Sequence, residues 1–259
     1  SSYRVTPFSL MKGFRLAGSR DGVKPVVVLE GSWSIAEGSY LSSLEFDNIE
    51  FRHEANNNYF MNTSKAYTIE NVSFVNCDFI SLRRGFWRHQ SANAKYIMNL
   101  EMEGCRFEGC GWQTSAYGAF NLQSFDKDNG VSYDQVDRAI FRNCTFSNDN
   151  DGTNGYGWGN LFYAPYMDKP IDLEYKNVTI YNYSRNQRLI NIESAVGSKL
   201  VMEGILLASP CGDLFAIGAN TTTTFSNNYT TADYTLGGKN MNATDLKITA
   251  AELFADPAN

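Results

Sequence analysis

A short motif recurs along the chain and constrains its fold more than any other feature of the sequence. The motif is an apolar strand followed by Asn or Gly, a small apolar residue, a polar residue and usually Phe or Ile. Its clearest copies begin at Asn48, Asn76, Gly104, Asn143 and Asn177, and weaker copies begin at Gly204 and Asn227. The copies follow one another at intervals of 23 to 39 residues. A period of this size, built from strands and variable loops, indicates a solenoid.

The recurring Asn suits a sharp corner between two strands. Asn adopts the left-handed backbone conformation at little cost, and Gly104 and Gly204 supply the same freedom without a side chain. An apolar strand with period-two alternation precedes each motif, and a second apolar strand follows after a loop. We therefore predict an all-β fold, a right-handed parallel β-helix with a short capping helix at the C-terminus. A β-sandwich is the competing interpretation, but its hairpins would not repeat one corner motif.

The repeat predicts one domain over residues 1–259. We expect irregular N-terminal coils over 1–40, regular coils over 41–235 and a C-terminal cap over 236–259. The cap contains Thr249 and Glu252 at the spacing of a capping box, which favours a short helix over the last coil.

Three cysteines share one position of the repeat. Cys77, Cys105 and Cys144 stand where other copies have Ile49 or Val178, so we expect buried, unpaired thiols that serve as small apolar groups. Cys110 and Cys211 fall in turns, where we expect thiols near the solvent.

The bulk composition excludes several classes of protein. The net charge of −6 argues against a nucleic-acid binder, because such proteins need a basic face to neutralise phosphates. No apolar run approaches the ~20 residues of a transmembrane helix. No signal peptide is visible at the start of the chain.

Several segments resemble one family of β-helices. The repeated Asn-Cys-x-Phe coils, Pro25–Val28, the segment Arg83–Arg88 and the closing Leu253–Pro257 are similar to β-helix domains of unknown function from gut Bacteroidetes. Those domains have the pectate-lyase-like fold and are encoded in polysaccharide-utilisation loci. The resemblance spans about residues 14–259. It implies an extracellular or outer-membrane-surface protein with a polysaccharide partner, and an additional N-terminal domain in longer forms.

The candidate binding site combines two long loops, 108–117 and 147–159, with the neighbouring second strands of the coils. Alternation from Phe86 places Trp87 and His89 outward, and Arg88 reaches solvent only if a bulge or a strand end intervenes. Aromatic rings suit the C–H faces of sugars, and amides and arginines suit hydroxyls and carboxylates. The predicted carbohydrate-binding residues are Arg84, Trp87, Arg88, His89, Trp112, Tyr117, Gln123, Tyr156, Trp158 and Tyr163. The plainer interpretation is that these aromatic side chains only pack.

Three functions remain open at this stage. The leading hypothesis is a non-catalytic polysaccharide-binding β-helix. The first alternative is a polysaccharide lyase or glycoside hydrolase in the same groove, with Arg88 or Lys95 as a lyase base and Glu193 as the main outward carboxylate. The second is a structural, adhesin-like rod. No cofactor is predicted, although the oxygen-rich loops 126–130 and 149–152 resemble calcium loops that lack the final carboxylate.

Overall fold

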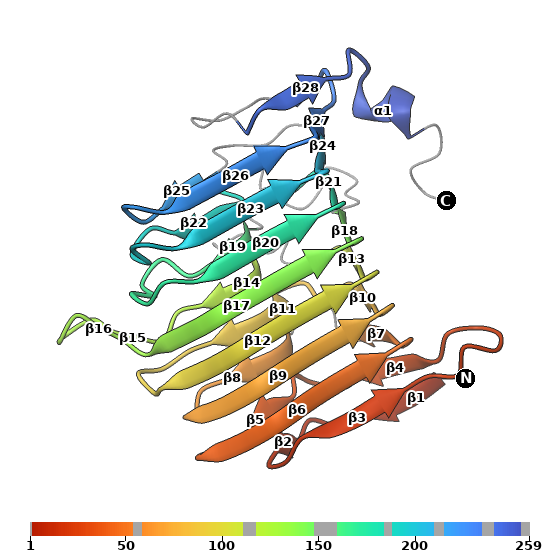
Figure 1. Cartoon of the computed structure of the whole chain (residues 1–259). Coiled ribbons are helices and arrows are strands. Elements are labelled where there is room, and N and C mark those ends of the chain that lie inside the picture. Colours follow the sequence, from red (N-terminus) through yellow and green to blue (C-terminus); the bar gives the residue numbers. More distant parts are fainter. Residues whose placement is uncertain are drawn as a thin grey trace.

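The chain forms a parallel β-helix. The computed structural model describes residues 2–53, 59–110, 118–147, 160–183, 188–209, 215–234 and 241–254. Its strands stack into three long sheets, and a regular coil passes through each sheet once (Figure 1). Neighbouring strands of these three sheets run parallel, for example Asp78↔Arg106 and Asp78↔Glu50. The predicted fold is therefore confirmed, and the β-sandwich is wrong because it would require antiparallel neighbours.

Each sheet is ordered by coil number along the stack. The eight-stranded sheet contains β3 (Phe14–Ala17), β6 (Ser39–Asp47), β9 (Tyr67–Val75), β12 (Lys95–Glu103), β17 (Asp134–Arg142), β20 (Asp172–Lys176), β23 (Lys199–Glu203) and β26 (Thr222–Ser226). The ten-stranded sheet contains β1 (Ser2–Val5), β4 (Val26–Leu29), β7 (Glu50–His53), β10 (Asp78–Ile80), β13 (Arg106–Glu108), β18 (Thr145–Ser147), β21 (Thr179–Tyr181), β24 (Leu206–Ala208), β27 (Asn228–Thr230) and β28 (Ala243–Asp245). The six-stranded sheet contains β8 (Tyr59–Thr63), β11 (Gly85–His89), β14 (Gly118–Leu122), β19 (Asn160–Tyr163), β22 (Ile190–Ile192) and β25 (Phe215–Ile217).

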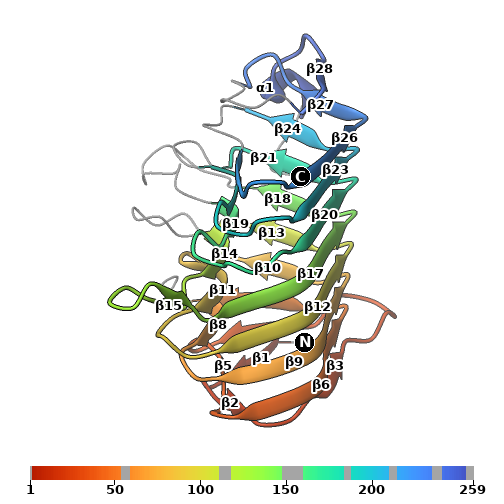
Figure 2. The ribbon, with the colours of Figure 1, turned by 60° about the vertical axis from the view of Figure 1, so that its left-hand side comes forward.

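Short elements complete the described chain. Strands β15 (Phe125–Asp126) and β16 (Val131–Ser132) form an antiparallel hairpin that projects from the stack (Figures 1 and 2). Strands β2 (Ser9–Leu10) and β5 (Ser34–Ile35) pair near the N-terminus. Helix α1 (Ala250–Leu253) begins at the predicted capping box, in which Thr249 and Glu252 bond each other's backbone. The C-terminal helix is thus confirmed.

The recurring Asn occupies the corner between the eight-stranded and ten-stranded sheets, as predicted. Asn48 and Asn76 have φ angles of 56° and 50°, and Gly104 has 63°. Asn76 Nδ2 donates to Asn48 Oδ1 of the preceding coil at 2.7 Å. The side-chain ladder is interrupted at Gly104 and resumes where Asn177 Nδ2 donates to Asn143 Oδ1 at 3.4 Å. The backbone ladder continues through Gly104, whose N–H donates to the carbonyl of Arg142 at 2.9 Å. Hydrogen bonds of both the backbone and the side chains therefore align successive coils at this corner.

Stacked aromatic rings fill the interior behind these corners. The motif residues Phe51, Phe79, Phe107 and Phe146 form a column with ring centres 5.5, 4.9 and 4.5 Å apart. Equivalent side chains stack because equivalent residues lie one strand spacing, ~4.8 Å, apart. The motif thus encodes a continuous core as well as the corner.

The four cysteines among the described residues are all free and buried. Cys77, Cys105 and Cys144 are buried free thiols, as predicted. Cys110 is also buried, so its placement near solvent is wrong. Its thiol points inward and donates to the carbonyl of Phe79 at 3.3 Å. Cys211 lies outside the described residues.

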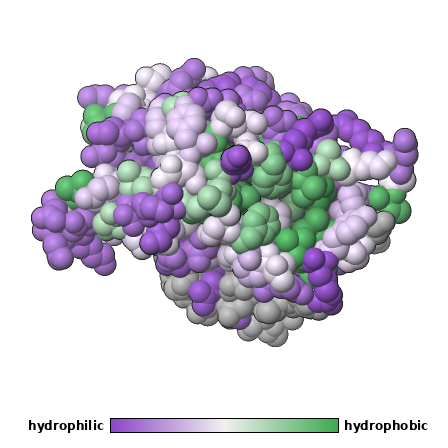
Figure 3. Space-filling model, turned by 90° about the horizontal axis from the view of Figure 1, so that it is seen from below, coloured by the Kyte–Doolittle hydropathy of each residue, from purple (hydrophilic) through white to green (hydrophobic). Residues whose placement is uncertain are grey.

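The N-terminal end of the stack is apolar. Seen from that end, hydrophobic atoms gather near the middle of the surface (Figure 3). A hollow of about 510 Å³ opens there, with Val5, Leu16 and Val27 among its lining residues. Thr222, Thr223 and Thr224 of β26, the last strand of the eight-stranded sheet, are exposed at the other end. The two ends of the rod therefore differ in chemistry.

Replacing Asn76 tests the corner. Asn76→Ala forces an alanine into a positive φ and removes the amide ladder, so we expect the free energy of unfolding to fall by about 2 kcal/mol. Asn76→Gly keeps the backbone freedom and loses only the side chain, so we expect about half that loss. Urea unfolding followed by circular dichroism measures both, and equal losses would contradict the role assigned to the left-handed corner.

Candidate functional site

Trp87 and His89 lie inside the β-helix, so their prediction as surface residues is wrong. Neither side chain has any exposed surface. Trp87 Nε1 donates to the hydroxyl of Tyr67 at 3.3 Å, and His89 Nε2 lies 2.6 Å from the same hydroxyl. Both residues therefore belong to the interior and cannot contact a ligand on the surface.

The cause is an irregular step in β11, at which two consecutive side chains point inward. Phe86 and Trp87 are consecutive, yet both are buried, and the Phe86 ring lies 4.5 Å from that of Phe79. The ladder register between β8 and β11 skips Phe86. The pairing offset is the same before and after this step, Gly85↔Tyr59 and Trp87↔Met61, because β8 has the same irregularity at Phe60 and Met61, which are also both buried. No residue is inserted, but two consecutive inward side chains reverse the alternation of the residues that follow. Arg88 consequently points outward and His89 inward.

An outward row crosses the six-stranded sheet after this irregular step. We call it the Arg88 row, and in ladder register it contains Asn62, Arg88, Asn121, Tyr163 and Asn191. Asn62, Arg88 and Tyr163 are partly exposed, whereas Asn121 and Asn191 are buried. The row presents three amides, a guanidinium and a phenol along the stacking direction.

Two amides in this row have unused hydrogen-bonding atoms. Asn62 Oδ1 and Asn121 Nδ2 are buried and have no hydrogen-bond partner within the described part of the chain. The other end of the Asn121 amide, Oδ1, accepts a hydrogen bond from Gln123 Nε2. In the next strand, both amide atoms of Asn160 are likewise buried and unpartnered by any described residue. Because buried polar atoms are nearly always paired, such atoms favour a polar ligand or ordered water.

Four of the predicted binding residues keep surface positions. Arg84, Arg88, Gln123 and Tyr163 are all partly exposed. The guanidinium carbon of Arg88 lies 5.5 Å from the centre of the Tyr59 ring, a cation–π contact that holds the side chain over the sheet. The remaining predicted residues lie outside the described residues: Trp112, Tyr117, Tyr156 and Trp158.

His89 is part of a buried polar network that the sequence analysis missed. His89 Nδ1 lies 2.7 Å from Asp134 Oδ1, and Asp134 Oδ2 accepts from the backbone N–H of Ser124 at 2.7 Å. With Nδ1 protonated toward Asp134, Nε2 accepts from the Tyr67 hydroxyl, which in turn accepts from Trp87. Burial lowers the pKa of the His89 imidazole, although the Asp134 carboxylate opposes that shift. The lowered pKa favours the neutral imidazole at neutral pH.

Lys95 belongs to the same interior. Its ammonium donates to Ser124 Oγ at 2.8 Å and to the carbonyls of Asn93 and Ser91 at 2.7 and 3.2 Å. Burial lowers the pKa of Lys95 to about 8. A general base must reach the proton that it removes. Lys95 is enclosed, so its nomination as the base of a lyase acting on the surface is wrong.

The candidate calcium loop 126–130 is the tip of the β15–β16 hairpin. Asp126 accepts hydrogen bonds from the backbone of Asp128 and from the backbone and side chain of Asn129, at 2.7 to 3.2 Å. These bonds lower the pKa of the Asp126 carboxyl, the Asn129 side chain first. The carboxylate thus caps its own turn, as Asp does in many loops. Within the described ranges, no three His, Cys, Asp or Glu residues gather as metal ligands. The second loop, 149–152, lies outside the described residues.

Comparison with protein-family models, curated proteins and solved structures finds no match for this chain. Of the helices in the described segments, none has the length and apolar character needed to cross a bilayer. The function must therefore be inferred from the residues and their geometry.

The buried imidazole predicts a specific pH dependence. As pH falls through about 6.5, the imidazole of the unfolded chain binds a proton while the folded one stays neutral, so the folded state loses stability. We expect up to about 1.4 kcal/mol of loss per pH unit from His89 over this range. The His89→Gln variant lacks this contribution, so the difference in unfolding free energy between it and the wild type should shrink from about pH 7 to about pH 5. Chemical denaturation at several pH values measures it, and a constant difference would refute a neutral His89.

Proposed function

We propose that this β-helix binds a polysaccharide along the outer face of its six-stranded sheet and does not catalyse a reaction on it. The observation that supports this most strongly is the Arg88 row, whose Asn62 and Asn121 amides carry buried, unused hydrogen-bonding atoms on a sheet face. Sugar hydroxyls both donate and accept, so they complement amides that need partners of both kinds. The partly exposed Tyr163 adds an aromatic surface for sugar C–H groups.

The charge of this face favours an acidic glycan. Arg84 and Arg88 lie close together in the chain, and both are partly exposed. A guanidinium binds a carboxylate in a bidentate manner, which a neutral sugar cannot match. We therefore place a uronate residue of the glycan beside Arg88. Binding to polysaccharides also agrees with the extracellular or outer-membrane-surface location that the family resemblance implies.

A lyase or hydrolase on the same face is the second candidate, and Arg88 is what favours it. An Arg beside a uronate could neutralise the carboxylate in lyase chemistry. Glu193, the outward carboxylate nearest this row in sequence, forms an ion pair with Arg188 at 3.2 Å. Glycoside hydrolases use a pair of carboxylates at a defined separation, and the Arg88 row itself contains none. We accordingly prefer binding over catalysis, and a structural rod remains the outcome if no glycan binds.

Affinity electrophoresis in gels containing polygalacturonate tests the proposal. Arg88→Ala should weaken retention about tenfold or more, since a charge-assisted hydrogen bond contributes ~1.5–3 kcal/mol. Arg106→Ala is the control, because Arg106 is an exposed arginine on a different sheet, the ten-stranded one, and this variant should retain the wild-type mobility. Ultraviolet absorbance of unsaturated products, recorded on the same mixtures, reports lyase action.

Three results would change the conclusion. A rise in absorbance would replace binding by catalysis. Equal loss of retention in the Arg88 and Arg106 variants would indicate a non-specific charge effect. Absence of retention on acidic and neutral glycans alike would leave a structural rod.

A further inference from the structure

A second polar surface with aromatic side chains lies on the eight-stranded sheet, away from the Arg88 row. Tyr40 of β6 and Tyr96 of β12 occupy the same ladder position, with Thr68 of β9 between them. Two strand spacings separate them, ~10 Å. Tyr40 is 58% exposed, and Tyr96 is partly exposed. The sheet thus presents two aromatic rings in line with the stacking direction.

Both tyrosines are held by their hydroxyl groups. Tyr40 donates to Glu70, and Tyr96 donates to Asp137, in each case a carboxylate on a neighbouring strand. Gln135 Nε2 also donates to Asp137 at 2.8 Å and holds that carboxylate in place. Because the bonds are made at the hydroxyl, they restrict the rings without covering their faces. A ring that is already ordered loses little conformational entropy when a ligand stacks on it.

A polar hollow lies further along the same strands, beginning three residues after the ladder position of the tyrosines. It has a volume of about 340 Å³ and is lined by Asn71, Ser73, Asn99, Glu101 and Arg138, with Val72 at its base. Asn99 Nδ2 lies 3.3 Å from Asn71 Oδ1, so the two amides form a short ladder across β9 and β12. Amides and a hydroxyl around a hollow are the groups that bind sugar hydroxyls.

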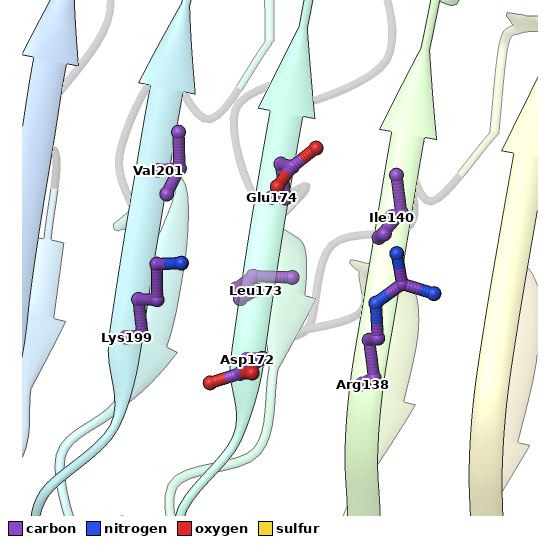
Figure 4. A pocket seen from close by; sticks show the side chains of 7 residues that line it. All are labelled: Arg138, Ile140, Asp172, Leu173, Glu174, Lys199 and Val201. Atoms are coloured by element: carbon purple, nitrogen blue, oxygen red, sulfur yellow. The ribbon is translucent and has the colours of Figure 1, made fainter.

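A smaller hollow continues this surface along the stack. It has a volume of about 180 Å³, and the side chains of Arg138, Asp172 and Lys199 project into it from three neighbouring strands (Figure 4). Arg138 lines both hollows and bonds Glu101 at 2.7 Å, so this ion pair separates them. Together the tyrosines and hollows form a surface that extends from β6 to β23.

The charge of this surface is opposite to that of the Arg88 row. Glu70, Asp137 and Asp172 have no basic partner within 4.0 Å among the described side chains, and Lys199 has no acidic one. Three unpaired carboxylates against one unpaired ammonium leave an excess of two negative charges. Like charges disfavour each other across an interface, so a uronate or sulfated chain would be repelled. The ligand that fits has hydroxyl groups and no negative charge.

We propose that Tyr40, Asn71, Ser73, Tyr96 and Asn99, here called the tyrosine strip, bind an uncharged glycan chain laid along the stack. The chain places sugar rings on the two tyrosines and hydroxyl groups in the hollow between Asn71 and Asn99. This site lies on a different sheet from the Arg88 row and does not depend on it. The protein then has two glycan faces, one for acidic chains and one for uncharged chains.

Microcalorimetry or affinity electrophoresis with uncharged oligosaccharides tests this inference, with cello-, manno- and xylo-oligosaccharides as the probes. The wild type should bind one of the three, and Tyr96→Ala should weaken that binding about tenfold through loss of one stacked ring. Tyr96→Phe keeps the ring and should stay within about threefold of the wild type. Ser73→Gln fills the hollow without adding charge and should also weaken binding.

Matched controls separate this site from the first. Tyr229→Ala removes another exposed tyrosine, on the ten-stranded sheet, and should leave binding unchanged. Tyr96→Ala should leave retention on polygalacturonate unchanged, and Arg88→Ala should leave the uncharged ligand unaffected. Thermal unfolding checks that each variant is folded. Failure of all three probes to bind the wild type, or equal affinity of wild type and Tyr96→Ala, would overturn the tyrosine strip while leaving the Arg88 row untouched.

Discussion

The in-register parallel ladder is the constraint on which the rest of this structure depends. Each coil contributes one strand to a sheet, and backbone hydrogen bonds hold equivalent residues ~4.8 Å apart. A local feature is therefore repeated along the stack. The long strands β9, β12 and β17 show this, since their registers all omit the residue before Asn71, Asn99 and Arg138. The pairing offset is the same on both sides of each omitted residue, so an irregular step in one coil is matched in its neighbours and shapes a whole face.

The ladder also explains why a polar network can persist in the interior. Tyr67, His89 and Asp134 come from three strands in successive coils, and the network is satisfied only when those coils are in register. A slip by one residue would leave a carboxylate and an ammonium buried without partners, at a cost of several kcal/mol. The aromatic columns tolerate small displacements, because stacking has no strict partner requirement. The polar network therefore supplies register specificity that the apolar core alone lacks.

The sequence predicted the fold because its signal is periodic. The corner Asn, the motif Phe and the three aligned cysteines all follow from one repeat, and the structure confirms each. The face assignment of β11 was wrong because Phe86 and Trp87 both point inward, whereas strict alternation allows only one of two consecutive residues to do so. His89 could not be placed without Asp134, its partner 45 residues away. The tyrosine strip did carry a signal, since Tyr40, Thr68 and Tyr96 recur at the same 28-residue interval as the first motif copies.

The outer faces of a stacked solenoid suit long, linear ligands. Both faces are parallel to the stacking axis, so a linear chain on either one meets a new set of side chains at every coil. Individual contacts can then be weak, because several of them act on one ligand and the rigid sheet loses little entropy on binding. Under the two proposals, charge decides between the faces: Arg88 attracts acidic chains to the six-stranded sheet, whereas Glu70, Asp137 and Asp172, which have no basic partner among the described side chains, repel them from the eight-stranded sheet. Selectivity is then set by a few outward residues, without any change to the core.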